Sequence, residues 1–177
     1  IYERVEAIGG ASSFLYGAGA VGGTINNVTK LAHREANLTE LKAAYGSFDS
    51  TQLAFGTNQL LDERNAVRLD VNRSTSNGWT DGSHREATSL AGSWLIDLTP
   101  ALRHTLALEY QKEQVDRPYW GTPILRPLGS EVSIDESTRF KNYNAQDGIY
   151  EQTVRWARSM LEFRASDSLS LRNTLYH

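Results

Sequence analysis

Strict alternation of apolar and polar residues, repeated along most of the chain, is the feature that most limits what this sequence can fold into. In the clearest run, residues 64–77, Val67, Leu69 and Val71 fall on one face and Arg68 on the other. This period of two is that of a β-strand, whereas an amphipathic helix needs apolar residues at three- and four-residue steps. The runs predicted to be strands are 37–46, 50–60, 64–77, 87–98, 102–115, 150–165 and 168–176. The sequence therefore predicts an all-β, antiparallel protein.

The connections between these runs alternate in length. Short turns follow the second, fourth and sixth runs, whereas long connections cover residues 77–86 and 116–149. Short turns at one end of a sheet and long loops at the other are typical of transmembrane β-barrels. The runs also reach the roughly 9–11 residues that a tilted strand needs to cross a bilayer. Alternation alone fits a soluble meander or sandwich equally well, so a soluble β-sheet module stays an alternative.

Composition excludes several other classes of protein. With 177 residues, 22% of them charged, and a net charge of −3, the chain lacks the basic excess of a nucleic-acid-binding protein. Cysteine is absent, which excludes disulfides, cysteine-based zinc sites and thiol nucleophiles. No apolar run approaches the ~18 residues of a membrane helix. No signal peptide is visible before Ile1, and the sequence is expected to be a partial one.

The glycine-rich stretch 17–22 matches the G-x-G-x-x-G pattern of dinucleotide-binding folds. That chemistry requires a helix directly after the glycines, so that its N-terminus meets the pyrophosphate. The following residues, GTINNVT, contain β-branched residues and asparagines that do not begin a helix. The sequence therefore predicts tight structural packing here rather than a nucleotide site.

The segment that contains these glycines, IYERVEAIGGASSFLYGAGAVGGTINNVTK, resembles the end of the plug domain of TonB-dependent outer-membrane receptors. In that family the plug closes with an ERVEV-like strand, an LYG step, a glycine-rich bend and INxVTK. The matching residues are 3–6, 15–17, 22–23, 25–26 and 28–30. Residues 7–13, AIGGASS, depart from the family pattern, which usually has a bulkier hydrophobe, a basic residue and a proline. The next stretches, 40–60 and 67–82, resemble the first barrel strands of siderophore receptors.

The resemblance implies a domain division and a function. Residues 1–33 would be the C-terminal end of a plug, and residues 34–177 the N-terminal part of a larger transmembrane barrel. The whole protein would be a monomeric receptor in the Gram-negative outer membrane, not an enzyme, that takes up a ferric siderophore. Its partners would be lipid and the TonB complex, engaged through a TonB box outside this sequence, and no nucleic acid. A receptor for cobalamin, haem or a glycan remains an alternative.

Candidate ligand contacts lie in the long connection, in DRPYWGTPILRPLG. Tyr119 and Trp120 suit the apolar faces of hydroxamate or catecholate chelates, and Arg117 or Arg126 an anionic complex. The alternative for the aromatic residues is an interfacial girdle or loop packing. The other predicted features are girdle positions for Tyr45 and Tyr110, and lumen-lining positions for Arg68, Asp70 and Glu109.

We predict no catalytic residue, no metal site and no cofactor. The histidines at 33, 84, 104 and 177 lack metal-ligand spacing, and no Ser-His-Asp arrangement is present in the sequence. Iron would arrive already chelated, so that protein ligands to the metal would not be needed.

Overall fold

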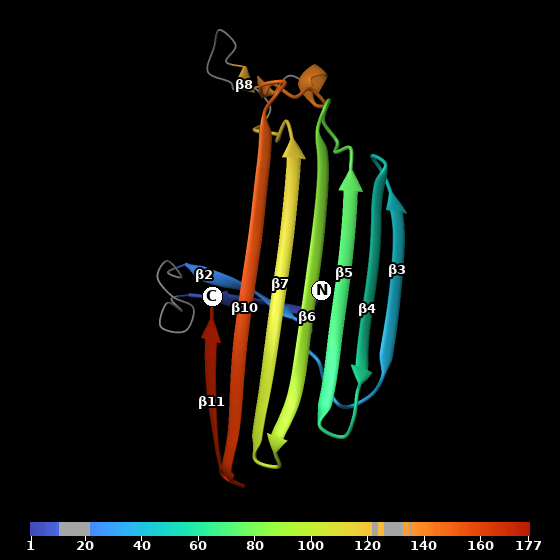
Figure 1. Cartoon of the computed structure of the whole chain (residues 1–177). Coiled ribbons are helices and arrows are strands. Elements are labelled where there is room, and N and C mark those ends of the chain that lie inside the picture. Colours follow the sequence, from blue (N-terminus) through green and yellow to red (C-terminus); the bar gives the residue numbers. More distant parts are fainter. Residues whose placement is uncertain (11–21, 122–123, 126–132, 135) are drawn as a thin grey trace.

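The computed structural model describes residues 1–10, 22–121, 124–125, 133–134 and 136–177. Its main feature is one antiparallel sheet of seven strands in the order β11-β10-β7-β6-β5-β4-β3 (Figure 1). The strands are β3 (Leu38–Gly46), β4 (Ser50–Leu60), β5 (Asn65–Ser76), β6 (His84–Thr99), β7 (Leu102–Asp116), β10 (Ile149–Ser166) and β11 (Leu169–Tyr176). The predicted all-β fold and its antiparallel pairing are confirmed.

Each of the seven predicted strands corresponds to a strand of this sheet. The largest difference is at the start of β6, which begins at His84 because His84 pairs with Asp116 across to β7. In β10 the alternation breaks at Trp156, which pairs with Glu109 and shares its face of the sheet. Neighbouring strands of the sheet follow one another along the chain, as in a β-meander. The long connection between the neighbours β7 and β10 contains two short strands that pair only with each other.

The two faces of the sheet have the reverse polarity of a soluble sheet. The apolar face is exposed, with Leu69 47% accessible, whereas its sequence neighbours on the opposite face, Arg68 and Asp70, are only 6% and 4% accessible. Other exposed residues of the apolar face are Leu41, Leu53, Phe55, Leu90, Trp94, Leu106 and Leu108. A soluble protein buries its apolar face to gain hydrophobic free energy, so this sheet is built for apolar surroundings on one side.

The N-terminal part of the chain forms a separate hairpin. Strands β1 (Tyr2–Gly9) and β2 (Gly23–Thr29) pair with each other and cross the long strands at a steep angle (Figure 1). Because β2 begins directly after the glycine motif, that motif is followed by a strand and not a helix, which agrees with the rejection of a nucleotide site. Most of the glycine motif lies outside the described residues.

The short turns gather at one end of the sheet and the longer connections at the other (Figure 1). At the short-turn end, Asp62 accepts hydrogen bonds from the backbone N–H groups of Arg64 and Asn65. Asn65 Nδ2 also donates to the Asp62 carboxylate. The bond from the Arg64 N–H, followed by that from the Asn65 side chain, holds the pKa of the Asp62 carboxyl below its usual value.

The long-loop end also carries β8 (Ile124–Leu125), β9 (Ser133–Ile134) and the short 3-10 helix η1 (Glu136–Thr138). Among the described residues, no helix is long and apolar enough to cross a membrane.

Candidate functional site

The polar face of the sheet holds the segment that follows β2. Asn58 of β4 is fully buried, and its Oδ1 accepts the His33 N–H at 3.0 Å. Its Nδ2 donates to the carbonyl oxygens of His33, at 2.9 Å, and Ala36, at 2.8 Å. Two strands away, on β6, Ser93 Oγ accepts the Ala32 N–H at 2.8 Å. Side chains of the sheet thus hold in place the segment that connects the N-terminal hairpin to β3.

A network of charged side chains also connects the end of the N-terminal hairpin to the sheet. Arg68 donates from Nε to Asp70 Oδ2 at 2.7 Å and from Nη2 to Glu40 Oε2 at 3.0 Å. Lys30, at the end of the hairpin, reaches the same Glu40 oxygen at 2.7 Å. Burial of Arg68 and Asp70 carries a desolvation cost that only close pairing offsets. Therefore the Arg68–Asp70 pair gives this face a defined arrangement to which Lys30 and Glu40 are attached.

Two further contacts join the hairpin to the central strands. Thr29 Oγ1 donates to Glu109 Oε1 at 2.9 Å, and the same carboxylate pairs with Arg158. Gln111 Nε2 donates to the hydroxyl of Tyr2 at 2.8 Å. The hairpin therefore lies against the polar face, on which Arg68, Asp70 and Glu109 also lie.

The predicted ligand contacts lie at the long-loop end of the sheet, away from the short turns. The Arg117 guanidinium is occupied by backbone carbonyl oxygens, of which that of Asn142 lies at 2.9 Å. Tyr119 packs edge-on against Trp79, with ring centroids 4.6 Å apart, and Trp120 is 82% exposed. Arg117, Tyr119 and Trp120 thus share one end of the molecule but differ in exposure and contacts. Arg126 lies outside the described residues.

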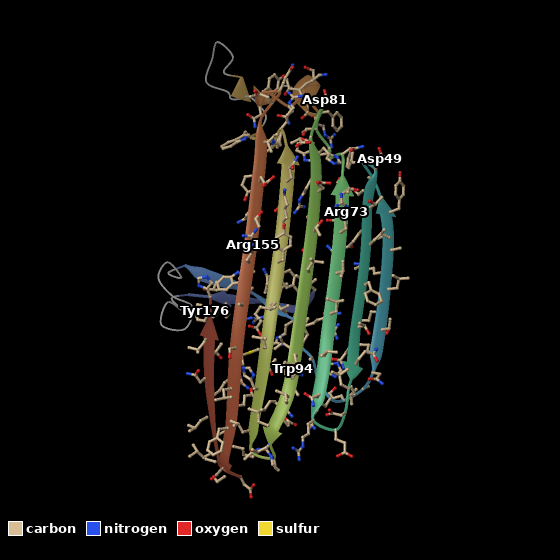
Figure 2. All side chains as sticks on the ribbon, in the orientation of Figure 1. Asp49, Arg73, Asp81, Trp94, Arg155 and Tyr176 are labelled. Atoms are coloured by element: carbon tan, nitrogen blue, oxygen red, sulfur yellow. The ribbon has the colours of Figure 1, made fainter. Side chains whose placement is uncertain are left out.

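The exposed face changes character along the strands. Its apolar part includes Trp94, in the half of the sheet nearer the short turns, whereas Arg73 and Arg155 lie in the long-loop half (Figure 2). Arg73 pairs with Glu86 at 2.8 Å, and Arg155 lies 5.9 Å from the ring centroid of Tyr110. An apolar band bordered by aromatic and charged residues is the pattern expected where a sheet passes from hydrocarbon to the polar interface.

The structure offers no metal centre in the part of the chain that it describes. No group of three or more His, Asp or Glu side chains that could hold a metal ion is found there. The His104 ring nitrogen Nε2 shares a hydrogen bond of 2.8 Å with Ser159 Oγ on the exposed face.

Comparison of the chain with known proteins identifies its relatives. No family model matches the chain. A probable TonB-dependent receptor, BfrD, of Bordetella pertussis is 30% identical over 164 residues, which cover 87% of this chain and 22% of that protein. A probable TonB-dependent siderophore receptor, PiuA, of Acinetobacter baumannii is 25% identical and covers 97% of this chain and 24% of its own length.

Solved structures agree. The pyoverdine outer membrane receptor FpvA of Pseudomonas aeruginosa, bound to pyoverdine, superposes with a TM-score of 0.86 at 25% identity, over 99% of this chain and 26% of that one. The chain belongs to the TonB-dependent receptors. It spans about a quarter of the length of the curated relatives that it matches. The predicted outer-membrane location of this TonB-dependent receptor is confirmed by these relatives, which are themselves receptors and not enzymes.

Several residues that make important contacts in the structure of this receptor were not predicted from the sequence. The sequence alone does not single out Asn58 or Ser93, because it does not indicate which backbone groups their side chains meet. Trp79 lies in a loop whose length, rather than its residues, supported the prediction of a barrel. Its signal was the presence of tryptophan, a large apolar side chain, among the glycines and polar residues of 77–83.

Proposed function

We propose that this chain is part of an outer-membrane receptor that takes up a ferric siderophore in a TonB-dependent manner. The observation that carries the proposal is the inverted polarity of the sheet, with its apolar face exposed and its polar face bonded to the N-terminal hairpin. This is the arrangement that a lipid-facing barrel wall with a plug inside it requires. A soluble β-sheet module would instead leave its large apolar face in water, at a high hydrophobic cost.

The proposal includes a division of the chain into two parts. We assign residues 1–33 to the end of the plug and residues 34–177 to the barrel wall. The bonds of Asn58 to His33 and Ala36 support a boundary at this point. The strands β3 and β11 form open edges of the sheet, and backbone groups in hydrocarbon must all be paired. The proposal therefore includes further strands, a complete plug and a TonB box in the whole receptor.

The ligand class is proposed from the relatives. One is named a probable siderophore receptor, and a solved neighbour is bound to pyoverdine. We propose that ligand recognition takes place at the long-loop end, where Tyr119, Trp120 and Arg117 lie. Polar groups of the lumen face would line the path that opens when TonB acts on the plug. A receptor for cobalamin, haem or a glycan would share this architecture, so the substrate requires an experiment.

The test is uptake by a strain that lacks the gene, complemented with the full-length receptor. Cells are supplied with ⁵⁵Fe-loaded siderophores that represent the pyoverdine, catecholate and hydroxamate classes, and with ⁵⁷Co-cobalamin. The proposal predicts receptor-dependent uptake of at least one iron complex, lost when TonB is also deleted. Uptake of cobalamin alone would contradict the siderophore class, and recovery of the receptor in the soluble periplasm would contradict the barrel.

A further inference from the structure

Arg117 joins separate stretches of chain at the long-loop end. Its φ of 46° turns the chain directly after β7, and its N–H donates to the carbonyl oxygen of Gly148, just before β10, at 2.6 Å. Its Nη2 donates to the carbonyl oxygens of Asn142 and Asn144, at 2.9 and 3.4 Å. Its Nη1 reaches the carbonyl oxygen of Asp81 at 3.5 Å. One side chain therefore connects the loop between β5 and β6 to the segment that leads into β10.

Other contacts return to the same residue. The carbonyl oxygen of Arg117 accepts Asn142 Nδ2 at 2.5 Å and Ser83 Oγ at 3.2 Å. Asn142 is buried, and its Nδ2 also lies 3.1 Å from Ser83 Oγ. Gly82 has a φ of 73°, and a Cβ at this position would lie 2.5 Å from Arg117 Nη1. We name Gly82, Ser83, Arg117 and Asn142 the loop hub.

The loop hub holds two aromatic rings from different loops together. Trp79 precedes Ser83 in the β5–β6 connection, and Tyr119 follows Arg117 in the β7–β10 connection. Their rings meet at 4.6 Å with an interplanar angle of 67°, an edge-to-face geometry favoured by the ring quadrupoles. Because each ring lies within four residues of a hub residue, the hub fixes where the pair is presented. Trp120, highly exposed, follows directly.

The contacts of Arg117 differ from those of a ligand-binding cation. In an anion-binding arginine, the N–H groups of the guanidinium point toward solvent or pair with a carboxylate, so that an anionic ligand can accept from them. Here the two terminal nitrogens are directed at three backbone carbonyl oxygens of the protein itself. Lysine cannot reproduce this pattern, because its ammonium is a single point on a flexible stem.

We propose that Arg117 is a positioning residue, and that Trp79 forms the ligand-recognition surface together with Tyr119 and Trp120. The surface would take the flat, apolar or aromatic face of a ferric chelate. Rigid aromatic side chains give large contact areas at small entropic cost, provided that they are held in place before the ligand arrives. The ligand class rests on the proposed function, whereas the role of the loop hub does not.

The experiment uses the full-length receptor purified in detergent. Hydrogen–deuterium exchange of peptides covering 77–83 and 139–148 is measured without ligand, in wild type, Arg117→Lys and Arg117→Ala. Affinities and their salt dependence are then measured for ⁵⁵Fe-loaded pyoverdine, a triscatecholate and a trishydroxamate. Trp79→Ala and Trp79→Phe test the aromatic ring. The matched control is Arg139→Ala, which removes the same charge from the same connection, at a residue whose guanidinium lies 5.3 Å from the Phe140 ring centroid.

The proposal predicts faster exchange of both peptides in both Arg117 variants. It also predicts a loss in affinity of about tenfold or more in each, from lost hydrogen bonds to a charged donor, with wild-type salt dependence. Trp79→Ala should lose affinity, Trp79→Phe should retain most of it, and Arg139→Ala should match wild type.

Different results overturn different parts of the proposal. Unchanged exchange in Arg117→Ala would overturn the loop hub. Wild-type affinity in Arg117→Lys, together with weakened binding and a reduced salt dependence in Arg117→Ala, would identify Arg117 as an anion contact. Wild-type affinity in Trp79→Ala would remove Trp79 from the recognition surface. If the wild-type receptor bound none of the three complexes, the proposed ligand class and the recognition surface would fail, while the exchange data would still decide the role of the loop hub.

Discussion

Replacement of Asn58 by alanine should release the segment that joins the N-terminal hairpin to the sheet. The buried Asn58 carboxamide makes three hydrogen bonds, to the His33 N–H and to the carbonyl oxygens of His33 and Ala36. At about 1 kcal/mol for each bond, the loss is about 3 kcal/mol of local stability. A change of that size corresponds to about a hundredfold in the equilibrium for local opening.

Hydrogen–deuterium exchange of a peptide covering residues 31–37 in the full-length receptor measures this opening. The His33 amide should exchange about a hundredfold faster in Asn58→Ala than in wild type. The matched control is Asn72→Ala on the same face of the sheet, where Asn72 accepts from Gln52 Nε2 at 2.9 Å. This control should leave the 31–37 peptide unchanged.

A second variant keeps the test decisive if Asn58→Ala fails to assemble. Asn58→Asp retains an acceptor for the His33 N–H but loses both donated bonds, and should accelerate exchange by an intermediate factor. Exchange of the 31–37 peptide at the wild-type rate in both variants would refute the reasoning, because it would mean that other contacts hold this segment.

Three further predictions concern the stability of the full-length receptor, measured by thermal unfolding in detergent unless stated. Gly56→Ala should lower the stability of the receptor by about 1–3 kcal/mol, because a Cβ there would lie 2.6 Å from Asp70 Oδ1. The control Gly92→Ala should be nearly neutral, because a Cβ there would lie 3.9 Å from the Arg68 carbonyl oxygen. Asp70→Asn should cost about 3–5 kcal/mol by leaving the buried Arg68 without its closest charge partner, and a melting temperature equal to wild type would contradict this. Asp62→Ala should destabilise at neutral pH. Because folding lowers the pKa of Asp62, the difference from wild type should shrink progressively as the pH falls below about 4; a difference that does not shrink below pH 4 would contradict the assignment.

The strands of this receptor could be predicted from sequence because their signal is local. Alternation such as that of Val67, Arg68 and Leu69 depends only on which face of one strand each residue occupies. The exposure of the faces could be predicted for the same reason, once loop lengths indicated a barrel. Trp156 shows the limit of this reasoning, since an aromatic side chain on the polar face breaks the pattern without ending the strand.

The contacts of the candidate site could not be predicted in this way, because they join residues distant in sequence. Arg117 was predicted as an anion contact from its charge and its place in the long connection. Its partners in the structure are carbonyl oxygens of Asp81, Asn142 and Asn144. A backbone carbonyl is present at every residue, so no residue type in the sequence marks these acceptors. The same holds for Asn58 and the backbone of residues 33–36.

The central claim is that the apolar face of the sheet meets lipid and the polar face meets the plug. Spin labels attached to single cysteines at positions 67 to 72 of β5, in the full-length receptor reconstituted into liposomes, test it most directly. Collision rates with oxygen, which concentrates in the bilayer, and with a water-soluble nickel chelate should alternate with a period of two. Oxygen should be favoured at Val67, Leu69 and Val71, and low access to both reagents should be found at the alternate positions. Equal access of the nickel chelate to both sets of positions would contradict a membrane-spanning wall.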